Sequence, residues 1–403
     1  MVLSGFLLRV LCILVLRAWR YTDAHWHLFE MASLGYSLVT GHGFSSPFGG
    51  NTGPSAWTAP AYPFVVAAAF RVFGIGSYAA AFAILVFNSF FAALTSWTIY
   101  RIARRVFNPP VAAWSGWLWA VLPTSIYFSV FWIWETTLST FLLSLLFMLT
   151  LQMENDARLR SWCGYGLLWG VTGLVNPSVL AWLPFSGCWL AWRLHRCGRR
   201  YVLPVAAGSM VFWITLAPWL ARNYVVFGQP LIRGDFGVEL HIGNNPEARG
   251  WWVPKYTCNN PVLYAQYKQM GEVAFDAEQG RLARDWIAEH PQEFLSLSLR
   301  RVWFFWIGIP YEGLEQTRRL VFLMWSLLSL GGLLLAIIRR LHGTFLFATL
   351  LIFYPLVYYF TFPNSRYRHV IEPELLVLAV FCVWSLFAPS RRAQAPAPEA
   401  ARP

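Results

Sequence analysis

The sequence predicts an all-α polytopic membrane protein with about ten transmembrane helices, interfacial helices in a long first outer loop and a small extracytoplasmic subdomain. Only 12% of the 403 residues are charged, whereas soluble domains carry about 25%. The mean hydropathy is +0.47, and the apolar residues gather in runs that reach the roughly 20 residues needed to cross a bilayer. The chain also has 23 tryptophans, a residue that favours the membrane–water boundary.

The apolar runs define the expected spans in order along the chain. We expect ten of them, at residues 3–21, 79–100, 110–129, 131–152, 163–177, 178–193, 203–221, 319–338, 344–362 and 371–388. The fifth and sixth meet at Asn176-Pro177, which either joins two short helices or kinks a single one.

The arginines predict how the chain is oriented in the membrane. Cytoplasmic loops carry an excess of basic residues, and arginines follow every even-numbered span: Arg101, Arg104, Arg105, Arg158, Arg160, Arg193, Arg196, Arg199, Arg200, Arg339, Arg340, Arg391 and Arg392. Both termini are therefore expected in the cytoplasm. The net charge of +12 is explained by these topology signals, so we expect membrane lipids and no nucleic acid as partners.

The spans and loops divide the chain into four parts. Residues 1–221 form an N-terminal transmembrane bundle that includes a long first outer loop at 22–78. Residues 222–318 form an extracytoplasmic segment, 319–388 the C-terminal transmembrane helices, and 389–403 an Ala/Pro-rich tail expected to be disordered in the cytoplasm. We expect a bacterial inner membrane as the location, with both outer segments facing the periplasm or exterior.

The extracytoplasmic segment is expected to be a small subdomain. Residues 222–246 are typical of short extended pieces with turns at Gly228 and at Asn244-Asn245-Pro246. Residues 264–306 predict a helix, a break near His290-Pro291 and a second helix that leads into the membrane. The six cysteines form no CxxC pair, and we predict no metal and no cofactor.

The first outer loop carries the main catalytic candidates. Asp23 and Glu30 are seven residues apart, so a helix over 23–38 would place both carboxylates on one face. A carboxylate at the membrane rim can serve as a general base. A metal held by His25, His27 and Glu30 is the alternative, although no HExxH-like spacing supports it. Further along, residues 60–73 predict an amphipathic helix in the membrane interface.

Charged residues also fall inside the predicted spans, among them Arg9 and Arg17 in the first span and Glu135 near the outer part of the fourth. A charge in the membrane is costly, so the two arginines are expected to pair or to reach the interface, and Glu135 is expected to have a partner.

Several segments together resemble the GT-C class of glycosyltransferases, which use polyprenyl-phosphate sugars and include the protein O-mannosyltransferases and the lipid A aminoarabinose transferases. The segments are a carboxylate soon after the first span, the turn Gly41-His42-Gly43-Phe44, the stretch Thr58 to Pro63, and residues 218–246 and 365–379. The chain departs from the class in two ways. Asp23 is followed by Ala24 instead of a second acid, and Thr58 stands where the lipid A enzymes have a lysine.

The resemblance implies inverting transfer of a sugar from a polyprenyl-phosphate donor to a lipid, glycan or protein acceptor on the extracytoplasmic face. Asp23 or Glu30 would be the catalytic base; Asp23 is somewhat too far from the GxGF turn and Glu30 somewhat too near, so both stay open. Asp235 and Glu239 are reserve acid/base candidates. Substrate-binding candidates are His27, Thr58, Tyr62, Asn244 and Asn245, although the two asparagines could equally form a turn.

Basic residues on the predicted outer face run against the topology rule and so suggest a ligand. A guanidinium can grip the phosphate of a lipid-linked donor with two hydrogen bonds. The candidates are Arg222, Arg366, Arg368 and His369. Contact with lipid headgroups or a pair with Glu372 is the alternative.

Two other functions remain alternatives. A flippase or transporter of lipid-linked oligosaccharides should show internal repeats and polar residues near the middle of several spans, and the sequence shows neither. An O-antigen ligase or polymerase would share the lipid-linked donor but would transfer a preassembled glycan.

Overall fold

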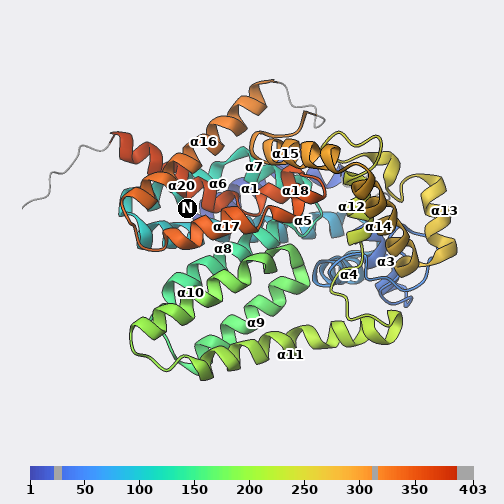
Figure 1. Cartoon of the computed structure of the whole chain (residues 1–403), viewed down its shortest axis with the longest axis horizontal. Helices are drawn as coiled ribbons and strands as arrows, with labels where there is room; N and C mark the ends of the chain where they lie inside the picture. The colour runs from blue at the N-terminus through green and yellow to red at the C-terminus, as the bar shows by residue number, and fades with distance from the viewer. Residues whose placement is uncertain (22–29, 311–315, 388–403) are drawn as a thin grey trace, which may run out of the picture.

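The computed structural model describes residues 1–21, 30–310 and 316–387, and these fold into helices joined by loops. Figure 1 shows a main body of packed helices with a smaller group at one end. Among the described residues, β structure is limited to one isolated bridge, between Ser45 and Pro54. The prediction of an all-α protein is confirmed. The main body contains α1 (Val2–Leu16), α5 (Tyr78–Val106), α6 (Pro109–Val121), α7 (Pro123–Phe131), α8 (Thr136–Gln152), α9 (Leu159–Val175), α10 (Leu183–Arg196), α11 (Val202–Phe227), α16 (Gln316–Ile338), α17 (Thr344–Phe353), α18 (Leu356–Phe360) and α20 (Glu372–Phe387).

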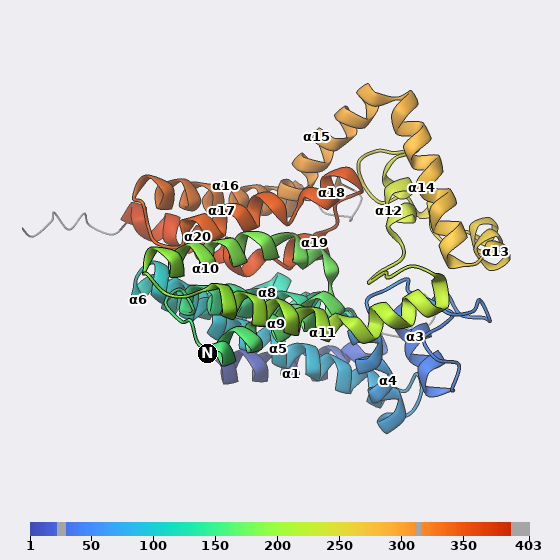
Figure 2. The same ribbon diagram turned by 60° about the horizontal axis from the view of Figure 1, so that its bottom comes forward.

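The smaller group comes from the first outer loop and the extracytoplasmic segment. Figure 2 shows α3 and α4 below and the arm of α12, α13 and α14 above, at the end of the body opposite the N-terminus. Its helices are α3 (Glu30–Val39), α4 (Ala61–Phe73), α12 (Phe236–Gly243), α13 (Pro261–Met270), α14 (Glu272–Glu289) and α15 (Pro291–Ile307), which returns to the body. Short elements complete the chain: η1 (Ala18–Arg20), η2 (Pro177–Trp182), η3 (Pro254–Tyr256) and α19 (Ser365–His369).

The expected secondary structure of these outer parts is partly confirmed. The described part of 23–38 is helical from Glu30 onward, residues 61–73 are helical, and the chain breaks at His290-Pro291 as predicted. The prediction of extended pieces is wrong at residues 236–243, which form α12. Val238 and Ile242 are four residues apart and both buried, so the apolar period there is helical.

The predicted spans are more divided than the sequence suggested. Three described helices are long and apolar enough to cross a membrane by length and composition: Tyr78–Val106, Val202–Phe227 and Arg319–Ile338. Two expected spans are each split into two helices at a proline: 110–129 at Pro123, and 344–362 at Pro355. Proline lacks the N–H that continues a helix. Asn176 ends α9 and Pro177 begins η2, so residues 163–193 form separate helices.

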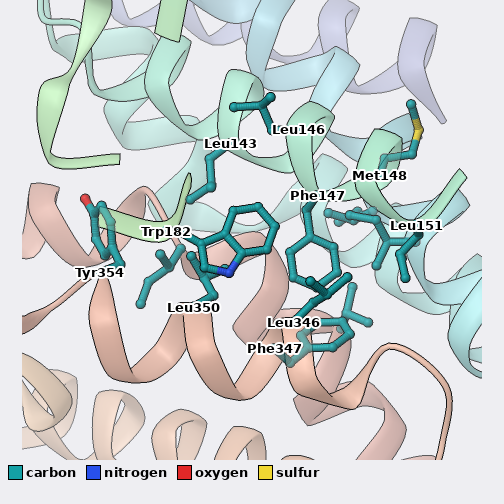
Figure 3. Packing of buried hydrophobic residues seen from close by; sticks show 14 of the residues in the cluster. Leu143, Leu146, Phe147, Met148, Leu151, Trp182, Leu346, Phe347, Leu350 and Tyr354 are labelled. Carbon is teal, nitrogen blue, oxygen red and sulfur yellow. The ribbon is translucent and has the colours of Figure 1, made fainter. Parts of the chain in front are cut away.

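Aromatic and aliphatic side chains from distant helices fill the centre of the body. Figure 3 shows Trp182 of η2 between α8 and α17, close to Phe147, Leu350 and Tyr354. The Trp182 and Phe147 rings are stacked, with centroids 5.2 Å apart and planes 6° apart. This packing joins residues more than 150 positions apart and fixes the C-terminal helices on the N-terminal bundle.

Arg9 shows how a buried charge is accommodated in the first helix. Its side chain is fully buried and donates to the carbonyl oxygens of Gly5 (2.9 Å) and Ala120 (2.8 Å) and to Ser125 Oγ (2.7 Å). Ala120 lies just before the break at Pro123, where helix carbonyls lose their usual N–H partners. The carbonyl oxygens left unpaired at the helix break therefore accept hydrogen bonds from the buried guanidinium. The expectation that Arg9 has partners is confirmed.

One carboxylate, that of Glu154, forms ion pairs with residues from several parts of the chain at the end of the body opposite α3 and α4. Glu154 accepts from Arg105 and pairs with Arg193 (3.1 Å) and His342 (2.6 Å). These partners come from the end of α5, from α10 and from the loop between α16 and α17. The pairing explains how the basic loops that follow the even-numbered spans lie together.

Glycines let α9 and α11 approach each other with backbone contact. A Cβ added to Gly166 would lie 2.0 Å from the Gly208 carbonyl oxygen, and one added to Gly170 would lie 2.5 Å from Thr215 Cβ. Gly166 and Gly170 are four residues apart, which is the small-residue spacing of closely packed membrane helices. The same helix carries Gly164, whose added Cβ would meet no atom within 4 Å.

We expect Gly166→Val to destabilise the protein and Gly164→Val to have little effect. The Gly166 variant must push α9 and α11 apart, and overpacking of this kind costs about 1–3 kcal/mol. Thermal unfolding of both variants in the same detergent measures the difference. Equal melting temperatures for the two variants would contradict the close packing described here.

Candidate active site

The first outer loop is tied to the extracytoplasmic segment by one buried carboxylate. Glu272, at the start of α14, accepts hydrogen bonds from Ser55 Oγ (2.6 Å), the Ala56 N–H (2.5 Å) and Tyr267 Oη (2.9 Å). Its side chain is 4% exposed. The Gly/Pro-rich part of the loop is thereby fixed against α13 and α14. The first outer loop and the extracytoplasmic segment then lie on either side of the second cavity described below.

Arg222, at the outer end of α11, holds the same loop from another side. Its guanidinium donates to the carbonyl oxygens of Ser55 (2.6 Å) and Phe44 (2.9 Å) and lies 5.1 Å from the centre of the Trp219 ring. These contacts occupy the donors that the sequence assigned to a phosphate. Arg222 lines neither of the two cavities described next.

A first cavity of about 380 Å³ opens between the helical body and the start of the extracytoplasmic segment. Its apolar lining comes from η2, the turn after α11, and α18. Its charged lining consists of two guanidinium groups and three carboxylates, namely Arg233, Arg366, Glu135, Asp235 and Glu239. An apolar wall beside a cluster of charges suits a molecule with a hydrocarbon part and a polar head.

A second cavity of about 390 Å³ lies between the first outer loop and the extracytoplasmic segment. It shares Glu239 and Arg366 with the first cavity, so these two side chains lie at the boundary of both. Glu30, the first residue of α3, lines only the second. Half of the other lining residues are aromatic.

Arg366 is held in place by aromatic rings and not by an ion pair. Its guanidinium carbon lies 4.4 Å from the centre of the Trp134 ring and 4.9 Å from that of Tyr367, and Nη2 donates to Tyr367 Oη (3.1 Å). No carboxylate of the described residues lies within 4.0 Å of it, although, against the lowering effect of burial, Glu135 and Glu239 raise its pKa from farther away. Its Nε has no hydrogen-bond partner among those residues, which leaves this donor available to an anion.

Arg233 has the opposite character. It forms ion pairs with Asp235 and, at 3.3 Å, with Glu239. Burial lowers the pKa of Arg233, but these two anions outweigh it and raise that pKa well above its ordinary value. Arg233 therefore neutralises the acidic residues of the segment and is a weaker candidate for an incoming anion.

The carboxylates beside the cavities have raised pKa values. Burial raises the pKa of Glu30, while the nearby guanidinium groups of Arg366 and Arg233 act in the opposite direction. Burial and the neighbouring Asp235 raise the pKa of Glu239 to about 7. Carboxylates with pKa values shifted toward neutrality are typical of acid–base sites.

The structure brings together some of the residues predicted from the sequence. Glu30 lines the second cavity, and Arg366, Asp235 and Glu239 line the first. Asp23 and His27, with His25, lie outside the described residues. The part of the chain that the structure describes contains no group of three or more His, Cys, Asp or Glu residues placed to hold a metal ion.

Arg368 and His369 point into the helical body and away from both cavities. Arg368 is 2% exposed, donates to Ser326 Oγ (3.0 Å) and lies 4.6 Å from the centre of the Phe322 ring. His369 pairs with Glu372 and stacks near Trp119, with ring centroids 5.5 Å apart. The pair between His369 and Glu372 matches the alternative in which Glu372 is a partner for this loop.

Three of the four described substrate-binding candidates have internal hydrogen bonds. Tyr62 is fully buried and bonds to Asn88. Thr58 is buried at 4% exposure, and its Oγ1 has no hydrogen-bond partner among the described residues. Asn244 donates to the carbonyl oxygens of Leu240 and Phe360, and Asn245 donates to that of His241. None of the four is among the residues that line the cavities. The two asparagines close the end of α12, which fits the turn interpretation.

The sequence offered little indication of several cavity residues. Glu135 was notable only as a charge in need of a partner, and Arg233 resembled any other loop arginine. Trp132 and Trp134 fall at the edge of a predicted span, where tryptophan is common for reasons unrelated to function. Glu135 could have been identified as a cavity residue from its position, since it is a charged residue at the end of a predicted span on the same side of the membrane as the extracytoplasmic segment.

Comparisons with known proteins agree with this architecture. The sequence model of the dolichyl-phosphate-mannose-protein mannosyltransferase family matches residues 57–221. A structure of the oligosaccharyltransferase of Archaeoglobus fulgidus tethered to an acceptor peptide shares the fold, with a TM-score of 0.51 and 13% identity over 92% of this chain and 45% of that one. No curated protein sequence matches the chain.

Two further structures are less similar. The archaeal oligosaccharyltransferase AglB from Archaeoglobus fulgidus, in complex with an inhibitory peptide and a dolichol-phosphate, has a TM-score of 0.49 and 13% identity over 96% of this chain and 50% of that one. ArnT from Cupriavidus metallidurans, bound to undecaprenyl phosphate, has a TM-score of 0.39 and 13% identity over 94% and 78%. The chain spans about half the length of the oligosaccharyltransferase chains it matches. The family match over residues 57–221 and the shared helical fold confirm the resemblance of this chain to the GT-C glycosyltransferases.

Proposed function

We propose that the protein is a membrane glycosyltransferase that moves a sugar from a polyprenyl-phosphate donor to an acceptor on the extracytoplasmic face. The observation that carries this proposal is Arg366, a guanidinium at the boundary of two cavities that forms no ion pair with a described residue. The donor occupies the first cavity, with its hydrocarbon chain along the apolar wall and its phosphate at Arg366. The acceptor occupies the second cavity beside Glu30.

The reaction in this arrangement is an inverting displacement. Glu30 removes the proton from the acceptor hydroxyl, and the resulting oxygen attacks the anomeric carbon from the face opposite the phosphate. The bond between that carbon and the phosphate oxygen breaks, and its electron pair leaves with the phosphate. Arg366 stabilises the charge that grows on the leaving phosphate. Asp235 and Glu239 are weaker candidates for the base because Arg233 is paired with both.

The chain in this proposal crosses the membrane ten times and keeps both termini in the cytoplasm. The cluster around Glu154 then lies at the cytoplasmic surface, and the two cavities lie at the outer surface. A bacterial inner membrane would place the site in the periplasm. The divided helices α6–α7 and α17–α18 each count as one crossing.

We expect Glu30→Gln to lower the transfer rate by about 10²–10⁴, the usual contribution of a general base. In the wild-type protein only the ionised carboxylate can act, so kcat/KM should fall as the pH is lowered through the raised pKa of Glu30, above the ordinary value of 4.5. Steady-state assays with a polyprenyl-phosphate sugar that supports transfer to membrane extracts measure both effects.

Asp23 remains the other candidate for this role and provides the decisive comparison. Asp23→Asn should be assayed beside Glu30→Gln, with unchanged melting temperatures as the control for folding. Full activity in the double variant would exclude a base in the first outer loop.

We expect Arg366→Ala to reduce transfer about tenfold to a hundredfold, since one lost charge-assisted bond to phosphate is worth roughly 1.5–3 kcal/mol. Arg366→Lys should recover part of the loss because it keeps the charge without the planar fork. Arg222→Ala is the matched comparison: its contacts are to the loop backbone, so it should lower the melting temperature as well as the rate. Wild-type kinetics for Arg366→Ala would show that the donor phosphate is bound elsewhere.

The orientation can be tested with introduced cysteines. Cys258 is a poor reporter because it is 6% exposed and burial raises the pKa of its thiol. Lys268 is exposed on α13, and Cys197 is exposed at the end of α10. We expect an impermeant maleimide on intact cells to label Lys268→Cys and to leave Cys197 unlabelled until the cells are lysed. The reverse pattern would invert the proposed topology.

A further inference from the structure

The second cavity is walled by aromatic rings that come from three distant parts of the chain. Trp57 belongs to the first outer loop, Trp132 and Trp134 to the turn before α8, and Trp252 to the extracytoplasmic segment. Trp57 and Trp134 are buried, while Trp132 and Trp252 remain partly exposed. The rings converge on a space of about 390 Å³, which is the size of a small-molecule site.

Polar groups stand among these rings. The carboxylates of Glu30 and Glu239 and the side chains of Asn259 and Asn364 also line the cavity. A ligand that fills it must present apolar faces to the indoles and hydrogen-bonding groups to the carboxylates and amides. A sugar ring does this, since its C–H groups form its faces and its hydroxyls project from its edge.

The charge of the lining limits which ligands fit. Two carboxylates face the cavity with one guanidinium, Arg366, which also borders the first cavity. An acidic ligand would meet both carboxylates in a partly desolvated space, where like charges repel strongly. An uncharged ligand avoids this cost.

The shape of the cavity argues against an extended peptide. Peptides are commonly bound along an exposed strand edge or as a helix in a long apolar groove. The only β bridge in the described residues, Ser45–Pro54, is isolated, and the cavity of about 390 Å³ is lined by aromatic residues from distant parts of the chain.

We propose that the second cavity binds an uncharged sugar ring, so that the acceptor is a saccharide, free or as the headgroup of a lipid. The ring lies against Trp132 and Trp252, and a hydroxyl points to Glu30. Calling this ligand the acceptor rests on the proposed function, whereas the binding of a sugar ring does not.

An introduced thiol allows the binding to be measured without catalysis, because Thr257 lines this cavity and is partly exposed, whereas the neighbouring Cys258 is buried. The full chain carrying Thr257→Cys is treated in detergent with N-ethylmaleimide, and peptide mass spectrometry follows the alkylation of the introduced thiol and of the exposed Cys197 in the same sample. Methyl hexopyranosides should slow the alkylation of the introduced thiol about threefold at a concentration about twice their Kd, and leave Cys197 unchanged. The corresponding methyl hexuronides, which differ by one carboxylate, should protect far less.

Adjacent tryptophans supply the matched variants. Trp252→Ala should abolish the protection, and Trp251→Ala should retain it, because Trp251 packs on Phe304 outside the cavity lining. The wild-type comparison decides the proposal even if the Trp252 variant fails to fold. Three results would overturn the proposal of a sugar site. They are protection by a Ser/Thr-containing peptide and not by the hexopyranosides, equal protection by hexopyranosides and hexuronides, and no protection by any of these ligands.

Sugar binding and transfer can fail separately. To distinguish the source of the sugar, lipid-free glycosides and short-chain glycolipids are compared in the same alkylation assay. Protection of the thiol introduced by Thr257→Cys, without transfer from any polyprenyl-phosphate sugar, would refute the proposed function and leave the sugar site standing.

Discussion

The candidate site depends on the contact between Glu272 and the first outer loop. Ser55 and Ala56 are more than 200 positions away from Glu272 in the sequence, yet they bond to the two oxygens of its carboxylate. The loop contributes Phe48 and Trp57 to the second cavity, and the segment that carries Glu272 contributes Trp252 and Glu239. Since irregular loops lack internal backbone pairing, such anchors are what give the cavity a defined shape.

The electrostatics of the site follow from the same arrangement. Four carboxylates (Glu30, Glu135, Asp235 and Glu239) and two guanidinium groups (Arg233 and Arg366) line the two cavities. A donor phosphate would add further negative charge. Burial raises the pKa of Glu30 and of Asp235, and burial together with Asp235 raises the pKa of Glu239 to about 7. Because acids outnumber bases here, an anion is expected only at the guanidinium of Arg366, in the first cavity.

The sequence predicted the fold class and the parts of the chain that form the site, because apolar runs and Gly/Pro-rich loops are local features. It identified Glu30 and Arg366 from their positions beside predicted spans. It could not separate Arg366 from Arg368, since only the helical turn of α19 directs one to the cavities and the other into the body. Nor could it show that Arg222 and Asn244 bond to the backbone of distant segments, because such pairing depends on tertiary contacts.

Comparison of the buried and partly buried arginines indicates which of them is suited to bind a ligand. Arg9 and Arg301 donate to carbonyl oxygens at helix ends, Arg222 donates to carbonyls of the first outer loop, and Arg233 is paired with carboxylates. Their polar groups therefore have partners within the protein, as burial requires. Among the described residues, the side chains of Arg366 and Arg368 each make ring contacts and one hydrogen bond to a hydroxyl, but Arg366 borders both cavities and Arg368 lines neither. Glu135 and Glu239 act on Arg366 only from beyond ion-pair distance. A cation with spare donors beside a cavity is the arrangement that an anionic substrate completes, and this supports the proposed position of the donor phosphate.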